Sequence, residues 1–186
     1  MSINRTYSLT LAQQYSSSWS IDSTNKPVLT YSFRQNTVSV IMMCSTSHQD
    51  SLQVFGEVSL QHYEMHLYSR CACWNTCGKP KPTTFSTTTA SMYFLLNETI
   101  LFLLITGPTP MTTNVIYYSA CTYHDSRYGT IELSSIGSMN GTATFTDIPS
   151  STTGNIFWSY NPCYKFSELS CQNVSGCRSK IHLIIA

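Results

Sequence analysis

Three of the eight cysteines lie close together, in the spacing C-x-C-x3-C at Cys71, Cys73 and Cys77. Cysteines at such spacing can bind zinc as thiolates or can form disulfides. No second cluster with metal-ligand spacing lies nearby, and His62 and His66, which share a strand face, have no third ligand at a suitable spacing. We therefore expect disulfides, no bound metal and no cofactor.

Other residue patterns that carry chemistry are missing from the sequence. No Ser-His-Asp set, pair of carboxylates or phosphate-binding loop stands out. Only 10% of the residues are charged and the net charge is +1, so there is no basic patch of the kind that binds nucleic acid. We expect neither an enzyme nor a nucleic-acid-binding protein.

The composition indicates an all-β protein of an oxidising compartment. Ser, Thr and Tyr are abundant, and all eight cysteines follow residue 43. Four N-glycosylation motifs begin at Asn4, Asn97, Asn140 and Asn173. We expect the lumen of the secretory pathway (endoplasmic reticulum, Golgi, endosome or lysosome) or the extracellular space. Residues 1–30 contain no apolar run suited to a signal peptide, so we expect that the natural start is missing or that the gene prediction is wrong.

Two strands joined by a disulfide are expected in the middle of the first half. Val38–Met43 is a short apolar run rich in Val, which predicts a strand. Val58–Tyr68 alternates, but its apolar side switches near Gln61, which suggests a bulge or a change of partner strand. Cys44 and Cys73 follow these two runs, and a disulfide between them would contribute roughly 3–4 kcal/mol.

The remaining segments are short and separated by turn residues. Strands are expected at Tyr7–Leu11 and Val28–Phe33, and again in several segments between residues 115 and 163. Residues 78–114 are expected to be a linker, and residues 178–186 a tail. Within the linker, residues 92–107 form the most apolar segment. It fits three readings: a secretory leader, a membrane span that would permit membrane association, or ordinary buried structure.

Two blocks of the sequence together resemble the mannose 6-phosphate receptor homology (MRH) domain. CTYHDSRYGTIELSSIG, NIFWSYNPCYKF and CQNVSGC, within residues 115–177, resemble the opening half of that domain. Within residues 1–77, the segment Leu11–Cys73 resembles the closing half, with Tyr63 ten residues before Cys73. The two halves therefore occur in swapped order.

The resemblance implies a site for a mannose-type sugar, which family members hold through Gln, Arg, Glu and Tyr side chains. By position, Gln14, Glu57 and Tyr63 match three of these residues. The place of the arginine holds Thr37, and Arg34 lies three residues before it, so we expect weakened sugar binding.

The resemblance also implies disulfide pairs Cys121–Cys163 and Cys44–Cys73, whereas a third family disulfide lacks both of its cysteines. Pairs Cys171–Cys177 and Cys71–Cys77 are sterically plausible, but their connectivity does not follow from sequence.

Two architectures and two functions remain open. Either the chain joins parts of two MRH domains, or residues 1–77 and 115–177 pack into one permuted, flattened β-barrel or β-sandwich. The second arrangement is expected if the chain folds alone, because half a barrel leaves unpaired edges and too little core. The function is either a lectin-like module for mannose-type N-glycans in glycoprotein sorting or quality control, or an MRH-like structural or protein-interaction part of a larger receptor that binds no sugar.

Overall fold

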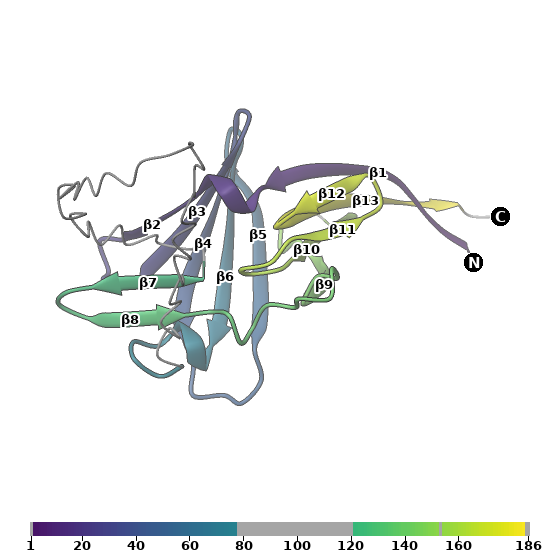
Figure 1. The fold of residues 1–186 in the computed structure, drawn as a ribbon. Coiled ribbons are helices and arrows are strands. Elements are labelled where there is room, and N and C mark those ends of the chain that lie inside the picture. The colour runs from purple at the N-terminus through teal and green to yellow at the C-terminus, as the bar shows by residue number, and fades with distance from the viewer. Residues whose placement is uncertain (1, 78–120, 153, 185–186) are drawn as a thin grey trace, which may run out of the picture. The chain divides into compact units, whose positions relative to one another are not determined.

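A computed structural model describes residues 2–77, 121–152 and 154–184, and side chains are described for residues 8–77, 121–152 and 154–180. The described residues belong to one compact unit that takes chain from both sides of the gap. The predicted linker 78–114, its apolar segment 92–107 and Asn97 lie outside the described residues. Figure 1 shows that the described chain is built mostly of strands, which agrees with the all-β prediction.

A five-stranded sheet, in the order β2-β3-β4-β6-β5, is built entirely from the first half of the chain. Its pairs are antiparallel except for β4 and β6, which run parallel with Val38 opposite Tyr63. The predicted strands near Val28–Phe33 and Val38–Met43 are both present. The strands of this sheet are β2 (Ser17–Ile21), β3 (Pro27–Phe33), β4 (Asn36–Cys44), β5 (Ser51–Ser59) and β6 (His62–Ser69).

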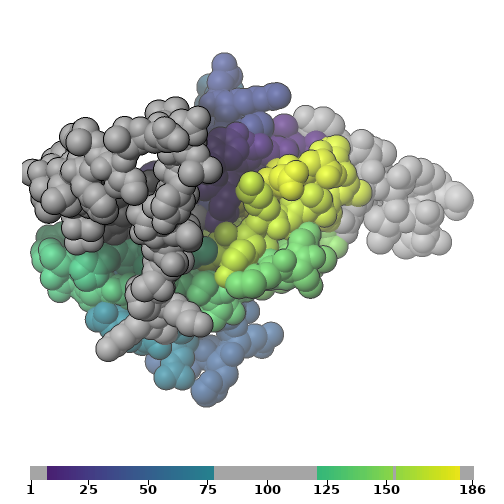
Figure 2. All heavy atoms as spheres, viewed as in Figure 1, coloured from purple at the N-terminus to yellow at the C-terminus, as the bar shows by residue number. Residues whose placement is uncertain are grey.

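A four-stranded sheet, in the order β1-β13-β10-β9, joins the two ends of the chain. Strand β13 lies between β1 and β10 and is antiparallel to both. In the space-filling view, the residues near the C-terminus (yellow) lie between N-terminal residues (purple) and the residues that precede them in the second half (green) (Figure 2). These strands are β1 (Ser2–Ala12), β9 (Phe145–Pro149), β10 (Ile156–Tyr160) and β13 (Gly176–Ile184).

Short elements complete the described structure. Two antiparallel pairs, β7 with β8 and β11 with β12, form separate two-stranded sheets. No closed barrel forms among the described strands. The elements are β7 (Thr122–Asp125), β8 (Gly129–Glu132), β11 (Phe166–Glu168), β12 (Cys171–Val174) and two 3-10 turns, η1 (Gln14–Ser16) and η2 (Arg70–Ala72).

Two expectations about local structure were wrong. The run Val58–Tyr68 is neither one bulged strand nor one strand that changes partners, because it holds the end of β5, a tight turn at Leu60–Gln61 and β6. Gln61 adopts a positive φ of 59°, which lets the chain reverse without a glycine. Residues 178–184 are not a tail, because their backbone pairs with β1 and, up to Lys180, with β10.

One buried core takes side chains from both halves of the chain. Tyr63 of the five-stranded sheet packs on Trp158 of the four-stranded sheet, with ring centroids 5.4 Å apart. Other contributors from the two halves are Leu29, Tyr31, Val40, Met65, Leu67, Ile131, Leu133 and Tyr160, all fully buried.

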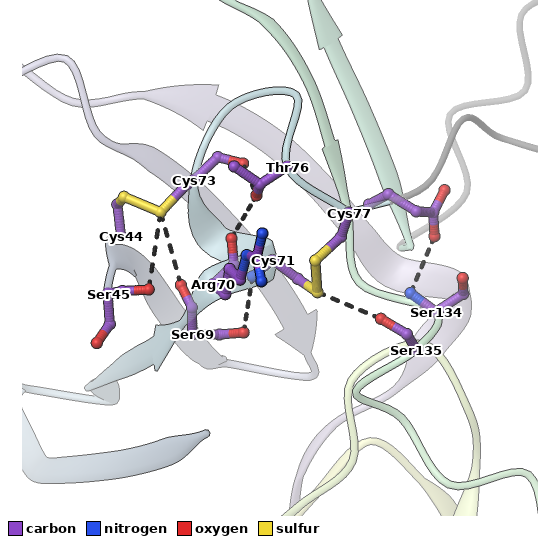
Figure 3. The surroundings of a disulfide bond; sticks show 11 residues. Cys44, Ser45, Ser69, Arg70, Cys71, Cys73, Thr76, Cys77, Ser134 and Ser135 are labelled. Carbon is purple, nitrogen blue, oxygen red and sulfur yellow. Dashed lines mark hydrogen bonds between the residues drawn. A yellow bond between two sulfur atoms is a disulfide. The ribbon is translucent and has the colours of Figure 1, made fainter. Parts of the chain in front are cut away.

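Four cysteine pairs lie at disulfide distance. They are Cys44–Cys73, Cys71–Cys77, Cys121–Cys163 and Cys171–Cys177, with Cα–Cα distances of 4.4, 4.9, 4.8 and 6.1 Å. Figure 3 shows the first two side by side, since Cys71 and Cys73 are separated by one residue. The Cys71 sulfur also lies 3.3 Å from the hydroxyl of Ser135, which belongs to the second half. Disulfides of this number indicate a secreted or lumenal protein.

A buried pair of tyrosines joins the two larger sheets. The hydroxyl groups of Tyr31 and Tyr160 lie 3.1 Å apart, and neither side chain is exposed. Burial raises the pKa of Tyr31 above its usual range. Burial raises the pKa of Tyr160 as well, and the neighbouring Tyr31 adds to this effect.

We expect this pair to make the fold unstable in alkali. Because the folded pKa values exceed the unfolded value of about 10, only the unfolded chain loses these protons readily above that pH. Stability is intact below pH 10 and falls above it, by up to about 1.4 kcal/mol per pH unit for each tyrosine. Urea unfolding between pH 8 and 11 should show a shallower fall for Tyr31→Phe than for the unmodified chain. Equal slopes would contradict the assignment.

Candidate functional site

A small pocket with a cavity volume of about 80 Å³ lies where the two larger sheets meet. Pockets for drug-sized ligands have volumes of roughly 300–1,000 Å³, so this one can hold only part of a small ligand, such as one edge of a single ring. Its lining comes from both halves of the chain: Gly56, Glu57 and Tyr63 from β5 and β6, and Thr152, Ile156, Trp158 and Arg178 from the second half.

The β5–β6 hairpin places Glu57 and Tyr63 on the same wall. The two residues are directly opposite in the antiparallel register, and directly opposite residues project to the same face. The Glu57 carboxylate also accepts a hydrogen bond of 2.8 Å from the backbone N–H of Gln61, which fixes it over the turn. Glu57 is exposed and Tyr63 is buried, so the carboxylate stands at the rim and the tyrosine lies deeper.

The second wall is built by the pairing of β10 with β13. Trp158 and Arg178 are directly opposite in this register, so their side chains share one face. Ile156 lies two residues from Trp158 on the same strand and projects to the same side. The Trp158 ring is 1% exposed and packs against Tyr63, which ties this wall to the first one.

A bulge in β5 brings the segment that follows β9 against the pocket. The Thr152 hydroxyl donates a hydrogen bond of 2.8 Å to the backbone oxygen of Phe55. Gly56 has a φ of +88°, and a Cβ there would lie 2.7 Å from the Ser150 Oγ and 2.9 Å from the Thr152 Oγ1. Glycine is therefore required at residue 56, both for its backbone conformation and for the close approach of this segment.

The pocket carries one charge of each sign. Glu57 supplies a carboxylate and Arg178, which is half-buried, supplies a guanidinium. In the part of the chain that the structure describes, no ion pair joins them. Trp158 and Tyr63 are almost fully buried, at 1% and 4% exposure, so a ligand meets mainly the two charged side chains and the Thr152 hydroxyl, which can hydrogen-bond its polar groups.

The structure separates the four residues that the resemblance implies. Glu57 and Tyr63 line the pocket, whereas Gln14 and Arg34 do not. Gln14 lies in η1, where its side-chain oxygen accepts a hydrogen bond from the Ser175 hydroxyl, and its buried amide nitrogen has no partner among the described residues. Arg34 is exposed in the β3–β4 turn, with its guanidinium 5.3 Å from the Phe33 ring centroid.

Arg178 and Trp158 are pocket residues that sequence reasoning did not select. Arg178 falls in the segment expected to be a tail. A signal was present, because the sequence just after Arg178 has apolar residues at alternate positions, Ile181, Leu183 and Ile185, which fits a strand. Nothing in the sequence, however, reveals which strand it pairs with.

The glycosylation motifs differ in the exposure and the hydrogen bonds of their residues. Asn140 and Asn173 are both exposed. The Asn140 side-chain oxygen accepts hydrogen bonds from the backbone N–H of Thr142 (3.0 Å) and from the Thr142 hydroxyl (2.5 Å). Ser175, the hydroxyl residue of the Asn173 motif, is fully buried. Asn4 lies in β1, and its side chain is outside the described part.

No model of a known protein family matches the chain, and no curated protein matches it significantly. Within the described ranges, no three His, Cys, Asp or Glu side chains gather in a way that would hold a metal ion. None of the described helices is long and apolar enough to cross a membrane.

Proposed function

We propose that this protein is a lectin-like module of MRH type that binds the terminal residue of a mannose-type N-glycan. The observation that carries the proposal is the pocket in which Glu57 and Tyr63, the two residues that the resemblance marks in the β5–β6 hairpin, share a wall. The opposite wall adds Trp158, whose ring lies 5.4 Å from that of Tyr63.

The chemistry of the pocket supports a sugar as the ligand. Each sugar hydroxyl donates and accepts, and a carboxylate, a phenol and a guanidinium satisfy it from fixed directions. The four disulfides support a place in the secretory pathway, where N-glycans occur and where glycoprotein sorting and quality control take place.

A glycan array tests this proposal, and two conservative substitutions connect the result to the pocket. We expect binding to mannose-terminated glycans, weakened about 10- to 100-fold by Glu57→Gln, since hydrogen bonds to a charged group contribute roughly 1.5–3 kcal/mol. Tyr63→Phe should weaken binding by about 10-fold, since it removes one neutral hydrogen bond.

Two matched variants on β6 serve as controls. Glu64→Gln and Tyr68→Phe make the same chemical changes within the same β5–β6 hairpin, at residues that do not line the pocket. Binding should survive both. An array without a mannose signal, or a signal that Glu57→Gln and Tyr63→Phe leave intact, would reject the lectin proposal.

A second function is favoured by the positions of Gln14 and Arg34. Both lie outside the pocket, and the Glu57 carboxylate is already engaged by its own turn. An MRH-like domain that has lost sugar binding and serves as a structural or interaction part of a receptor would have these features. The empty array described above is the result that this alternative expects.

A further inference from the structure

The guanidinium of Arg178 is the cation among the residues that line the pocket. The Arg178 side chain is half-buried and, within the described part of the chain, makes no hydrogen bond or ion pair. A guanidinium presents five N–H donors in a fixed fork, and a partly buried one loses some of its contacts with water. Arg178 therefore faces the pocket with donors that no described side chain uses.

The backbone holds Arg178 firmly in place. It lies on β13, the strand with neighbours on both sides, where Leu9 is opposite on β1 and Trp158 is opposite on β10. An arginine on a paired inner strand is fixed near its Cα, so only the side chain needs to be ordered when a ligand binds. The Arg178 guanidinium is therefore a preorganised hydrogen-bond donor rather than a mobile charge on the surface.

The charges on the two walls restrict the class of ligand. A purely anionic ligand at Arg178 would meet the Glu57 carboxylate across the pocket, and a purely cationic one would meet Arg178. A neutral polyol avoids both penalties, because its hydroxyl groups donate to Glu57 and accept from Arg178. The small cavity volume of about 80 Å³ admits only one edge of such a ligand.

We propose that Arg178 contacts the bound sugar directly and donates hydrogen bonds from its fork to two adjacent hydroxyl groups of one neutral ring. The resemblance implies an arginine at the position that holds Thr37 in the first half. In this arrangement Arg178 of the second half supplies that charged donor instead. Arg178 would then decide which pair of neighbouring hydroxyls fits, since both oxygens must lie within reach of one planar group. The inference rests on the proposed lectin function and adds to it a specificity-determining residue.

Calorimetric titration of the full chain with methyl α-D-mannopyranoside tests the inference. We expect Arg178→Gln to weaken binding about 10- to 100-fold, and Arg178→Lys to weaken it less, because lysine keeps the charge but loses the planar fork. Methyl α-D-glucopyranoside, which differs at a single hydroxyl, should bind more weakly than the mannoside to the unmodified chain. Arg178→Lys should reduce that preference.

The control variant is Arg127→Gln, at an exposed arginine of the β7–β8 turn whose guanidinium lies over the Tyr128 ring. It should bind the mannoside as the unmodified chain does. Thermal unfolding of each variant without sugar shows whether the fold is intact. If Arg178→Gln does not fold, Arg178→Lys decides by its change in sugar preference.

The possible results separate the two proposals. If the mannoside binds and Glu57→Gln weakens it, but Arg178→Gln and Arg178→Lys change neither affinity nor preference, the role of Arg178 is rejected and the lectin function stands. If the unmodified chain binds no sugar in the titration and on the array, both proposals are rejected.

Discussion

Replacing Trp158 with alanine is expected to lower the free energy of unfolding by about 3–5 kcal/mol. The Trp158 side chain is 1% exposed and packs against Tyr63 across the junction of the two sheets. Its removal leaves a cavity between strands that come from opposite halves of the chain, and a paired sheet cannot close such a space easily. Urea unfolding followed by circular dichroism at neutral pH gives the measurement.

Two further variants make the Trp158 experiment specific. Tyr15→Ala, at a side chain that is 78% exposed, should change stability by less than about 0.5 kcal/mol. Trp158→Phe should cost much less than Trp158→Ala, because it keeps an aromatic ring and removes an indole N–H that is buried without a described partner. A loss below about 1 kcal/mol for Trp158→Ala would mean that the two sheets do not share a core at this residue.

Removing the Cys121–Cys163 disulfide by a double alanine substitution is expected to cost about 4 kcal/mol. These cysteines are 42 residues apart in sequence, and a cross-link that closes a long loop restricts the unfolded chain strongly. The Cys121–Cys163 bond also ties the start of the β7–β8 hairpin to the segment that follows β10. Urea unfolding under non-reducing conditions measures the effect.

The matched control is the double alanine variant of Cys171 and Cys177. Their separation is only 6 residues, so the same chain-entropy argument gives a smaller loss of about 2 kcal/mol. Both double variants remove one disulfide and add none. If the short loop costs as much as the long one or more, loop closure is not the main source of the stabilisation.

Two strands of the first-half sheet, β3 and β4, were predicted because their apolar residues form short local runs, whereas β2 and most of β5 were not predicted. Val38, Val40 and Met42 alternate with less buried residues and are all buried, and Cys44 ends the strand as the disulfide argument required. The turn at Leu60–Gln61 was missed because its residues carry none of the usual signals. Leu60 is an apolar residue that is 87% exposed, and Gln61 takes a positive φ that glycine or asparagine more often adopts.

The pocket could be only half predicted, and the reason is long-range pairing. Glu57 and Tyr63 come from one hairpin, so a resemblance within that hairpin was enough to select both. Trp158 and Arg178 reach the same pocket because β13 pairs with β10 in one particular register. A shift of one residue in that register would send the Arg178 side chain to the opposite face, and no local pattern fixes it.

The pairing of β1 with β13, the first and last strands along the described chain, has a practical consequence for protein engineering. Ser2 is opposite Ile184 in the β1–β13 register, so the first and last described residues are neighbours in one antiparallel ladder. A short peptide can bridge strands at that spacing, as hairpin loops of a few residues do. Head-to-tail cyclisation by a protein ligase is therefore geometrically feasible. A circular chain made in this way could then be cut at the exposed Leu60 turn to give new termini.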